Sequence, residues 1–227
     1  MRHLLFLHGA MGAQSEFNSL MEKLGKEYQC HSLDFYGHGQ SSFGAQFGID
    51  VFAEQTMEYI RQYDIKGCDV FGYSMGGYVA LFLEQANPGT FRSIMTLGTK
   101  LQWTQEGSEK EASRLNPEVM EEKVPEYVDS LKKLHGDKWK ELCIQTANMM
   151  RYLGNMPLVT LETLADIRIP VRLGIGDLDR MVTLDETVAA FRVLRKGSFL
   201  VMPTTPHPLA QVNKDRLAYK IEKFLET

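Results

Sequence analysis

The chain has few cysteines, and their arrangement excludes two kinds of protein. Its 227 residues contain three, Cys30, Cys68 and Cys143, which lie far apart and form no Cys-x-x-Cys pair. An odd number of widely spaced cysteines without such a pair indicates neither a disulfide framework nor a zinc site. We therefore expect no metal and a reduced, cytoplasmic setting, and nothing in the sequence requires a cofactor.

Basic clusters and long apolar runs are also missing. The net charge is -4 and no run of five Lys or Arg residues occurs, which argues against a surface for nucleic acid. The opening "MRHLLFLHG" has only four consecutive apolar residues, too few for a signal peptide or a membrane helix. We expect a small-molecule partner, with no nucleic acid and no membrane, and the sequence does not indicate an oligomeric state.

Short apolar runs that alternate with helical patterns predict an α/β fold. Six strands are expected, at Leu4–His8, Gln29–Phe35, Cys68–Gly72, Ser93–Gly98, Val171–Gly176 and Ser198–Pro203. Strands separated by helices form a parallel sheet with helices on both faces. In such sheets the active site lies beyond the carboxyl ends of the strands.

One interval, residues 99–166, contains no strand pattern and many charged helical stretches. A structureless loop of that length is uncommon within a compact domain. We interpret residues 99–166 as a helical lid inserted into a core made of residues 1–98 and 167–227. Ordinary crossover helices that pack on a sheet face are the alternative.

The stretch "FGYSMGGYV" places Ser74 between Gly72 and Gly76, directly after a predicted strand and before a helical pattern, Met75–Ala86. This order is typical of a nucleophile elbow, a sharp turn that exposes a serine hydroxyl. An ordinary glycine turn is the alternative.

A serine hydroxyl becomes a nucleophile only when a base accepts its proton, and a carboxylate must orient that base. Of the six histidines, His207 alone lies between the last strand and the last helix. Asp177 and Asp179 both follow the fifth strand. We favour Asp179 because it lies further into the loop, and we expect Asp177 to cap the turn.

Backbone N–H groups must stabilise the oxyanion that develops on an attacked carbonyl. Met75 begins the helix after Ser74, and Ala10 follows Gly9 at the end of the first strand, so we expect these two amides to act. Candidate residues of the substrate pocket are Trp103, Met149, Met150 and Lys100.

Taken together, "LHGAMGAQSEF", "LDFYGHGQS", "FGYSMGGYVAL", "GIGDLDRMV" and "TTPHP" resemble the α/β-hydrolase family. The resemblance implies a catalytic triad of Ser74, Asp179 and His207, and an oxyanion hole made by Ala10 and Met75. It also implies that "GHG", with His38, is a structural turn. The His-Gly segment comes so early that the sheet should lack the family's first two strands.

The resemblance implies a serine hydrolase that cleaves a small carboxylic ester or thioester through an acyl-enzyme intermediate. Carbon-carbon bond hydrolysis of a diketone uses the same residues and is one alternative. A ligand receptor with the same fold and little turnover is another.

Overall fold

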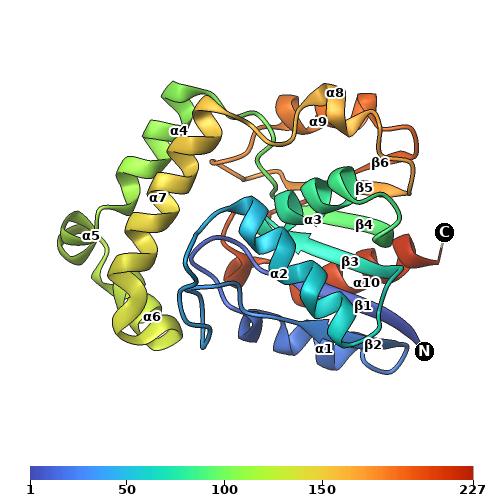
Figure 1. Cartoon of the computed structure of the whole chain (residues 1–227), viewed down its shortest axis with the longest axis horizontal. Coiled ribbons are helices and arrows are strands. Elements are labelled where there is room, and N and C mark those ends of the chain that lie inside the picture. The colour runs from blue at the N-terminus through green and yellow to red at the C-terminus, as the bar shows by residue number, and fades with distance from the viewer. Residues whose placement is uncertain (227) are drawn as a thin grey trace.

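A computed structural model of the chain, in which residues 1–226 are described, contains a single parallel sheet (Figure 1). Its strands are β1 (Arg2–Leu7), β2 (Tyr28–Ser32), β3 (Cys68–Tyr73), β4 (Phe91–Leu97), β5 (Val171–Gly176) and β6 (Gly197–Met202). They lie in the order β2-β1-β3-β4-β5-β6, and every neighbouring pair is parallel. The prediction of a six-stranded α/β fold is confirmed.

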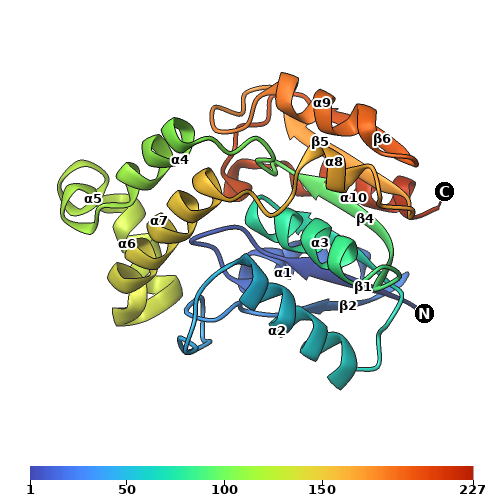
Figure 2. The ribbon, with the colours of Figure 1, turned by 45° about the horizontal axis from the view of Figure 1, so that its top comes forward.

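Helices cover both faces of the sheet (Figure 2). One face carries α2 (Ile49–Gln62), α3 (Met75–Ala86), α8 (Leu161–Leu164) and α9 (Leu184–Val193). The other carries α1 (Asn18–Leu24) and α10 (Lys214–Leu225). Successive side chains of a strand point to opposite faces, so Leu5 and Leu7 join the core under α2 and α3, whereas Leu4 and Phe6 join the core under α1 and α10.

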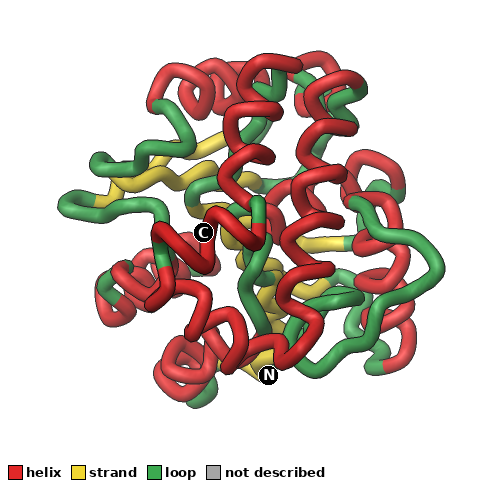
Figure 3. The backbone as a smooth tube through the Cα atoms, turned by 90° about the vertical axis from the view of Figure 1, so that its left-hand side faces the viewer, coloured by secondary structure: helices red, strands yellow, loops and turns green. Residues whose placement is uncertain are grey.

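The connection from β4 to β5 is almost entirely helical. It contains α4 (Gln105–Ala112), α5 (Pro117–Lys123), α6 (Pro125–His135) and α7 (Trp139–Asn155) before α8. We call residues 105–155 the cap segment. Its helices lie at the end of the molecule toward which the strands point, with α4 packed along α7 (Figures 1 and 3). The following helix, α8, returns to the sheet and contacts α9 and α3.

The second strand ends earlier than its apolar pattern predicts. Leu33 and Phe35 continue the apolar pattern and are buried, but β2 ends at Ser32. The N–H of Phe35 donates a hydrogen bond to Nε2 of His8, 3.1 Å away, in place of a bond to a neighbouring strand. The chain therefore leaves the sheet beside the turn that follows β1.

Candidate active site

Ser74 lies in the turn between β3 and α3, and its backbone is strained. Its φ of 49° and ψ of -116° are unusual for a residue with a side chain. A Cβ atom on Gly72 would lie 2.4 Å from Cα of Gly77, and one on Gly76 would lie 2.1 Å from the carbonyl oxygen of Leu7. Glycine at position 72 therefore lets the first turn of α3 fold back onto β3, and glycine at position 76 lets that turn lie against the end of β1.

Neighbouring strands hold this turn in place. The N–H of Ser74 donates to the carbonyl oxygen of Leu97 at the end of β4, 2.9 Å away. The hydroxyl of Thr99 donates to the carbonyl oxygen of Ser74, 3.0 Å away. Because both ends of the strained residue are bonded to the β4 segment, the surrounding structure maintains a conformation that an isolated turn would avoid.

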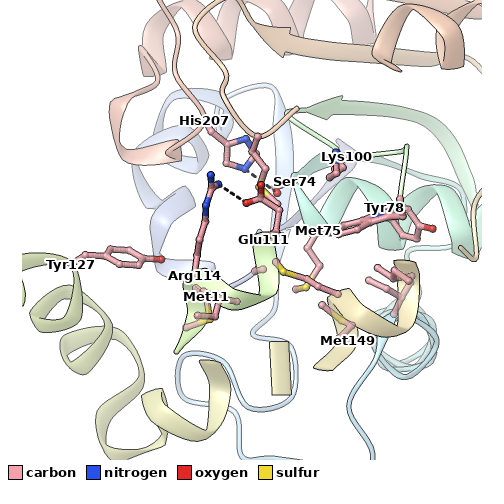
Figure 4. Close-up of a pocket in the computed structure, with 17 residues that line it drawn as sticks. Met11, Ser74, Met75, Tyr78, Lys100, Glu111, Arg114, Tyr127, Met149 and His207 are labelled. Carbon is pink, nitrogen blue, oxygen red and sulfur yellow. Dashed lines mark hydrogen bonds and ion pairs between the residues drawn. The ribbon is translucent and has the colours of Figure 1, made fainter. Parts of the chain in front are cut away.

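A chain of hydrogen-bonding distances links the three residues predicted for the triad. The Oγ atom of Ser74 lies 3.3 Å from Nε2 of His207 (Figure 4). On the other side of the ring, Nδ1 of His207 lies 2.7 Å from Oδ2 of Asp179. A carboxylate only accepts hydrogen bonds, so the proton is on Nδ1. The lone pair of Nε2 therefore faces the serine hydroxyl.

Asp179 is held as a carboxylate by three donors. Its Oδ1 atom accepts hydrogen bonds from the N–H groups of Met181 and Val182, at 2.8 and 2.9 Å, while Oδ2 accepts from His207. Burial opposes the charge, but the hydrogen bond from His207 and the two amides outweigh burial and lower the pKa of Asp179. The group is therefore ionised at neutral pH, as a partner for a histidine base requires.

Asp177 has a different position. Its Oδ1 atom accepts a hydrogen bond from the N–H of Thr205, 3.0 Å away, and the amides of Thr205 and Thr204 lower its pKa. The residue is exposed, and its bond fixes the loop that carries His207, whereas the bond to the His207 ring comes from Asp179. It caps a turn, as the sequence predicts for this residue.

Tyr73, directly before the nucleophile position, also holds this loop, and the sequence analysis missed it. Its hydroxyl donates a hydrogen bond to the carbonyl oxygen of His207, and the two rings are 5.7 Å apart. Only its place beside Ser74 in the motif could have indicated this role.

The two amides predicted for the oxyanion hole come from segments on either side of Ser74. Met75 is the first residue of α3, so its N–H has no acceptor within the helix. Ala10 follows Gly9, where a Cβ atom would lie 3.3 Å from Cβ of Ser74. Ala10 and Met75 line one cavity together with Ser74.

This cavity has a volume of about 210 Å³, and Ser74 and His207 form part of its lining (Figure 4). All four predicted pocket residues, Trp103, Met149, Met150 and Lys100, line its wall. The ammonium group of Lys100 already has a partner, because its Nζ lies 3.4 Å from the buried carboxylate of Glu186.

The cap segment adds an ion pair and an aromatic ring that the sequence analysis did not select. Nη1 of Arg114 lies 2.7 Å from Oε2 of Glu111. Both residues line the cavity, as does Tyr127 of α6. In the sequence these three residues look like ordinary surface residues of a helical segment, so no local pattern indicates that they line a cavity. The remaining wall is mainly aliphatic and includes three more methionines, Met11, Met75 and Met181.

Three further properties concern residues 1–226 as a whole. No group of three or more His, Cys, Asp or Glu side chains among them is arranged to hold a metal ion. Within the same range, no helix has both the length and the apolar character needed to cross a membrane. Each of the three cysteines is unpaired.

The sequence and the fold are similar to those of known proteins. A family model described as alpha/beta hydrolase fold matches residues 2–145. Ethanol acetyltransferase 1 of Hanseniaspora uvarum is 24% identical over 96 residues, which are 41% of this chain and 29% of that protein. The pimeloyl-[acyl-carrier protein] methyl ester esterase of Neisseria meningitidis is 29% identical over 93 residues, 41% of this chain and 35% of that protein.

The matches to these curated relatives thus span about a third of the relatives' length. A solved structure matches along the whole chain. It is the 2-hydroxy-6-oxo-6-phenylhexa-2,4-dienoate hydrolase from Rhodococcus sp. strain RHA1, with a TM-score of 0.80 and 20% identity, and the match covers 100% of this chain and 91% of that one. At this identity the likeness concerns the fold.

Proposed function

Because this chain belongs to the alpha/beta hydrolase fold family, we propose that it is a serine hydrolase that cleaves a small carboxylic ester or thioester. The observation that carries the proposal is the hydrogen-bonded series from Ser74 through His207 to Asp179, with 3.3 Å and 2.7 Å between the paired atoms. The bond from His207 to Asp179 is short, and the separation between Ser74 and His207 is the slightly longer distance common between a nucleophile and its base before substrate binds.

In the proposed mechanism, Nε2 of His207 accepts the hydroxyl proton while Oγ of Ser74 attacks the carbonyl carbon of the substrate. Asp179 stabilises the resulting imidazolium cation. The cation then gives its proton to the departing alcohol or thiol, which leaves an acyl-enzyme. Water, deprotonated by the same histidine, attacks the acyl-enzyme. The bond from the acyl carbon to Oγ of Ser74 breaks, His207 returns the proton to Oγ, and the carboxylic acid leaves.

The amides of Ala10 and Met75 are the proposed donors to the oxyanion formed in each step. Removal of one such donor in a serine protease costs about 3–4 kcal/mol of transition-state stabilisation. The N-terminal end of α3 favours negative charge at the same place, since its first N–H groups have no acceptor within the helix.

The cavity supports a small, largely apolar acyl group. Its volume of about 210 Å³ is below the range of about 300–1,000 Å³ common for drug-sized ligands. Methionine side chains adapt to ligands of different shape because they are unbranched and polarizable. We propose that residues 99–166 act as a lid, because Trp103, Glu111, Tyr127 and Met149 of this segment form one wall of the cavity.

Hydrolysis of a carbon-carbon bond in a diketone-type substrate is the second candidate. It uses the same residues, and the solved dienoate hydrolase that matches the whole chain favours its inclusion. We also propose a cytoplasmic setting, since the cysteines are unpaired.

Labelling with a fluorophosphonate, together with a panel of p-nitrophenyl esters from acetyl to decanoyl, tests the proposal. We expect one label per chain on the wild type, none on Ser74→Ala, and full labelling on Ser130→Ala, whose serine is exposed on α6. Equal labelling of Ser74→Ala would refute the mechanism. Labelling without turnover of any ester would favour the receptor, and turnover of a dienoate diketone alone would favour the carbon-carbon hydrolase.

A further inference from the structure

His135, the last residue of α6 in the cap segment, contacts the turn that carries Ala10. Its side chain is buried, and the residue is 2% exposed. Its Nε2 atom lies 2.9 Å from the carbonyl oxygen of Met11, which is 124 positions earlier in the chain. Its Nδ1 atom lies 2.9 Å from the backbone nitrogen of Gly39. Both ring nitrogens of His135 are therefore bonded to the core of the protein.

These two bonds determine the tautomer of His135. The N–H of Gly39 can only donate, so Nδ1 must accept and cannot carry a proton. The carbonyl oxygen of Met11 can only accept, so Nε2 must carry the proton. A neutral imidazole with its proton on Nε2 satisfies both partners. Burial lowers the pKa of His135, and Lys138 lowers it further against the opposing effects of Met11 and Asp34, which agrees with a neutral ring.

The bonded carbonyl belongs to a residue with an unfavourable backbone conformation. Met11 has a φ of 61°, which costs free energy for a residue with a side chain. Within the turn, the N–H of Gly12 donates to the carbonyl oxygen of Gly9, 3.1 Å away. Ala10 lies between them and immediately before Met11. The bond from His135 thus restrains, from outside the turn, the segment whose Ala10 amide the proposed function uses.

We propose that His135 is a positioning residue for the oxyanion hole: through Met11 it holds the Ala10 amide in place, and it links the closed cap segment to catalysis. This inference rests on the proposed function, because it concerns one of the two proposed oxyanion donors. A cap helix that shifted away from the core would break the bond to Met11 and release the turn. Formation of the oxyanion hole and closure of the cap are coupled in this arrangement.

Two substitutions at His135 separate the two bonds. The side-chain amide of asparagine lies near the place of Nδ1, so His135→Asn can still accept from Gly39 but cannot reach Met11. The amide of glutamine lies near the place of Nε2, so His135→Gln can still donate to Met11 but leaves Gly39 without its acceptor. Each variant loses one buried hydrogen bond, so the losses in stability should be similar.

Their effects on turnover should differ. The concentration of active sites is measured by titration with fluorophosphonate, and kcat is calculated per active site. We expect His135→Asn to lower kcat about ten- to a hundredfold and to leave KM within about twofold, because a displaced oxyanion donor affects the transition state more than the bound substrate. His135→Gln should keep kcat within about threefold of the wild type. The affinity for phenylboronic acid, whose tetrahedral adduct on Ser74 places an oxygen in the oxyanion hole, should fall in parallel with kcat.

Equal kcat values for both variants, whether unchanged or equally reduced, would overturn the inference, because the bond to Met11 would then have no separate effect. If Ser74→Ala is still labelled by fluorophosphonate, the proposed serine hydrolase function is wrong. If Ser74→Ala is not labelled but the two His135 variants have equal kcat values, only the role of His135 is wrong. If either variant does not fold, the nitrogen-15 spectrum of the wild-type His135 ring decides. We expect a proton on Nε2 and a change of its signal on binding phenylboronic acid, and a proton on Nδ1 or an unchanged signal would overturn the inference.

Discussion

Replacing Asp179 with asparagine should impair catalysis through the orientation of the new amide. In the wild type, Oδ1 of Asp179 accepts from the N–H groups of Met181 and Val182, and Oδ2 accepts from His207. The oxygen of an asparagine must face the two backbone donors, so its NH₂ group faces Nδ1 of His207. The histidine then has to accept at Nδ1 and carry its proton on Nε2, where it can no longer take a proton from Ser74.

The expected magnitude follows from this change of tautomer. The equivalent substitution in a serine protease lowers kcat by about 10⁴-fold, which corresponds to about 5 kcal/mol in the activation free energy. We expect Asp179→Asn to lower kcat by at least a few hundredfold, or about 3 kcal/mol. The fold should persist, since both hydrogen bonds to the 181–182 backbone are retained.

Asp177→Asn is the matched control. Asp177 is exposed, and an asparagine oxygen can still accept from the N–H of Thr205. We expect less than a tenfold change in kcat on the best p-nitrophenyl ester, with thermal unfolding measured for both variants. If Asp177→Asn is the inactive variant while Asp179→Asn remains active, the acid of the triad has been assigned to the wrong residue.

Three further outcomes concern stability. Gly76→Ala should lower the unfolding free energy by about 1–3 kcal/mol or more, because its Cβ would lie 2.1 Å from the carbonyl oxygen of Leu7; an unchanged urea midpoint would contradict this. Tyr78→Phe should cost about 1–3 kcal/mol, because the Tyr78 hydroxyl accepts from both N–H groups of residues 158–159, and calorimetry would show it as a lower Tm. Acidification from pH 6.5 to 4 should destabilise the protein, because burial lowers the pKa of His8 to about 4, so the unfolded state binds a proton that the folded state does not. Over this range His8 alone should lower the free energy of unfolding by roughly 3 kcal/mol. A urea midpoint that does not change with pH would contradict this.

Local patterns in the sequence were sufficient to predict the sheet and the order of the candidate site. The strand β5 and the helix α3 begin and end at the predicted residues. Both elements depend on apolar patterns and turn residues that lie close together in the sequence, so a local pattern is enough to predict them. The positions of Ser74, Asp179 and His207 at strand ends followed from the same patterns. The end of β2 was predicted three residues too late, because the bond from Phe35 to His8 joins two separate segments.

The geometry of the site was decided by tertiary structure. No local pattern indicates that the pair of amides at residues 181–182 orients Asp179, or that Tyr73 bonds to the loop of His207. The bond between His135 and Met11 joins residues 124 positions apart. Such contacts form only after helices and strands have packed, because they join segments that are far apart in the sequence and come close only in the folded chain. The sequence alone therefore determined which residues are available for chemistry. The packing of the loops at the strand ends determined which of them are held together, and the packing of the cap segment added the bond from His135 to Met11.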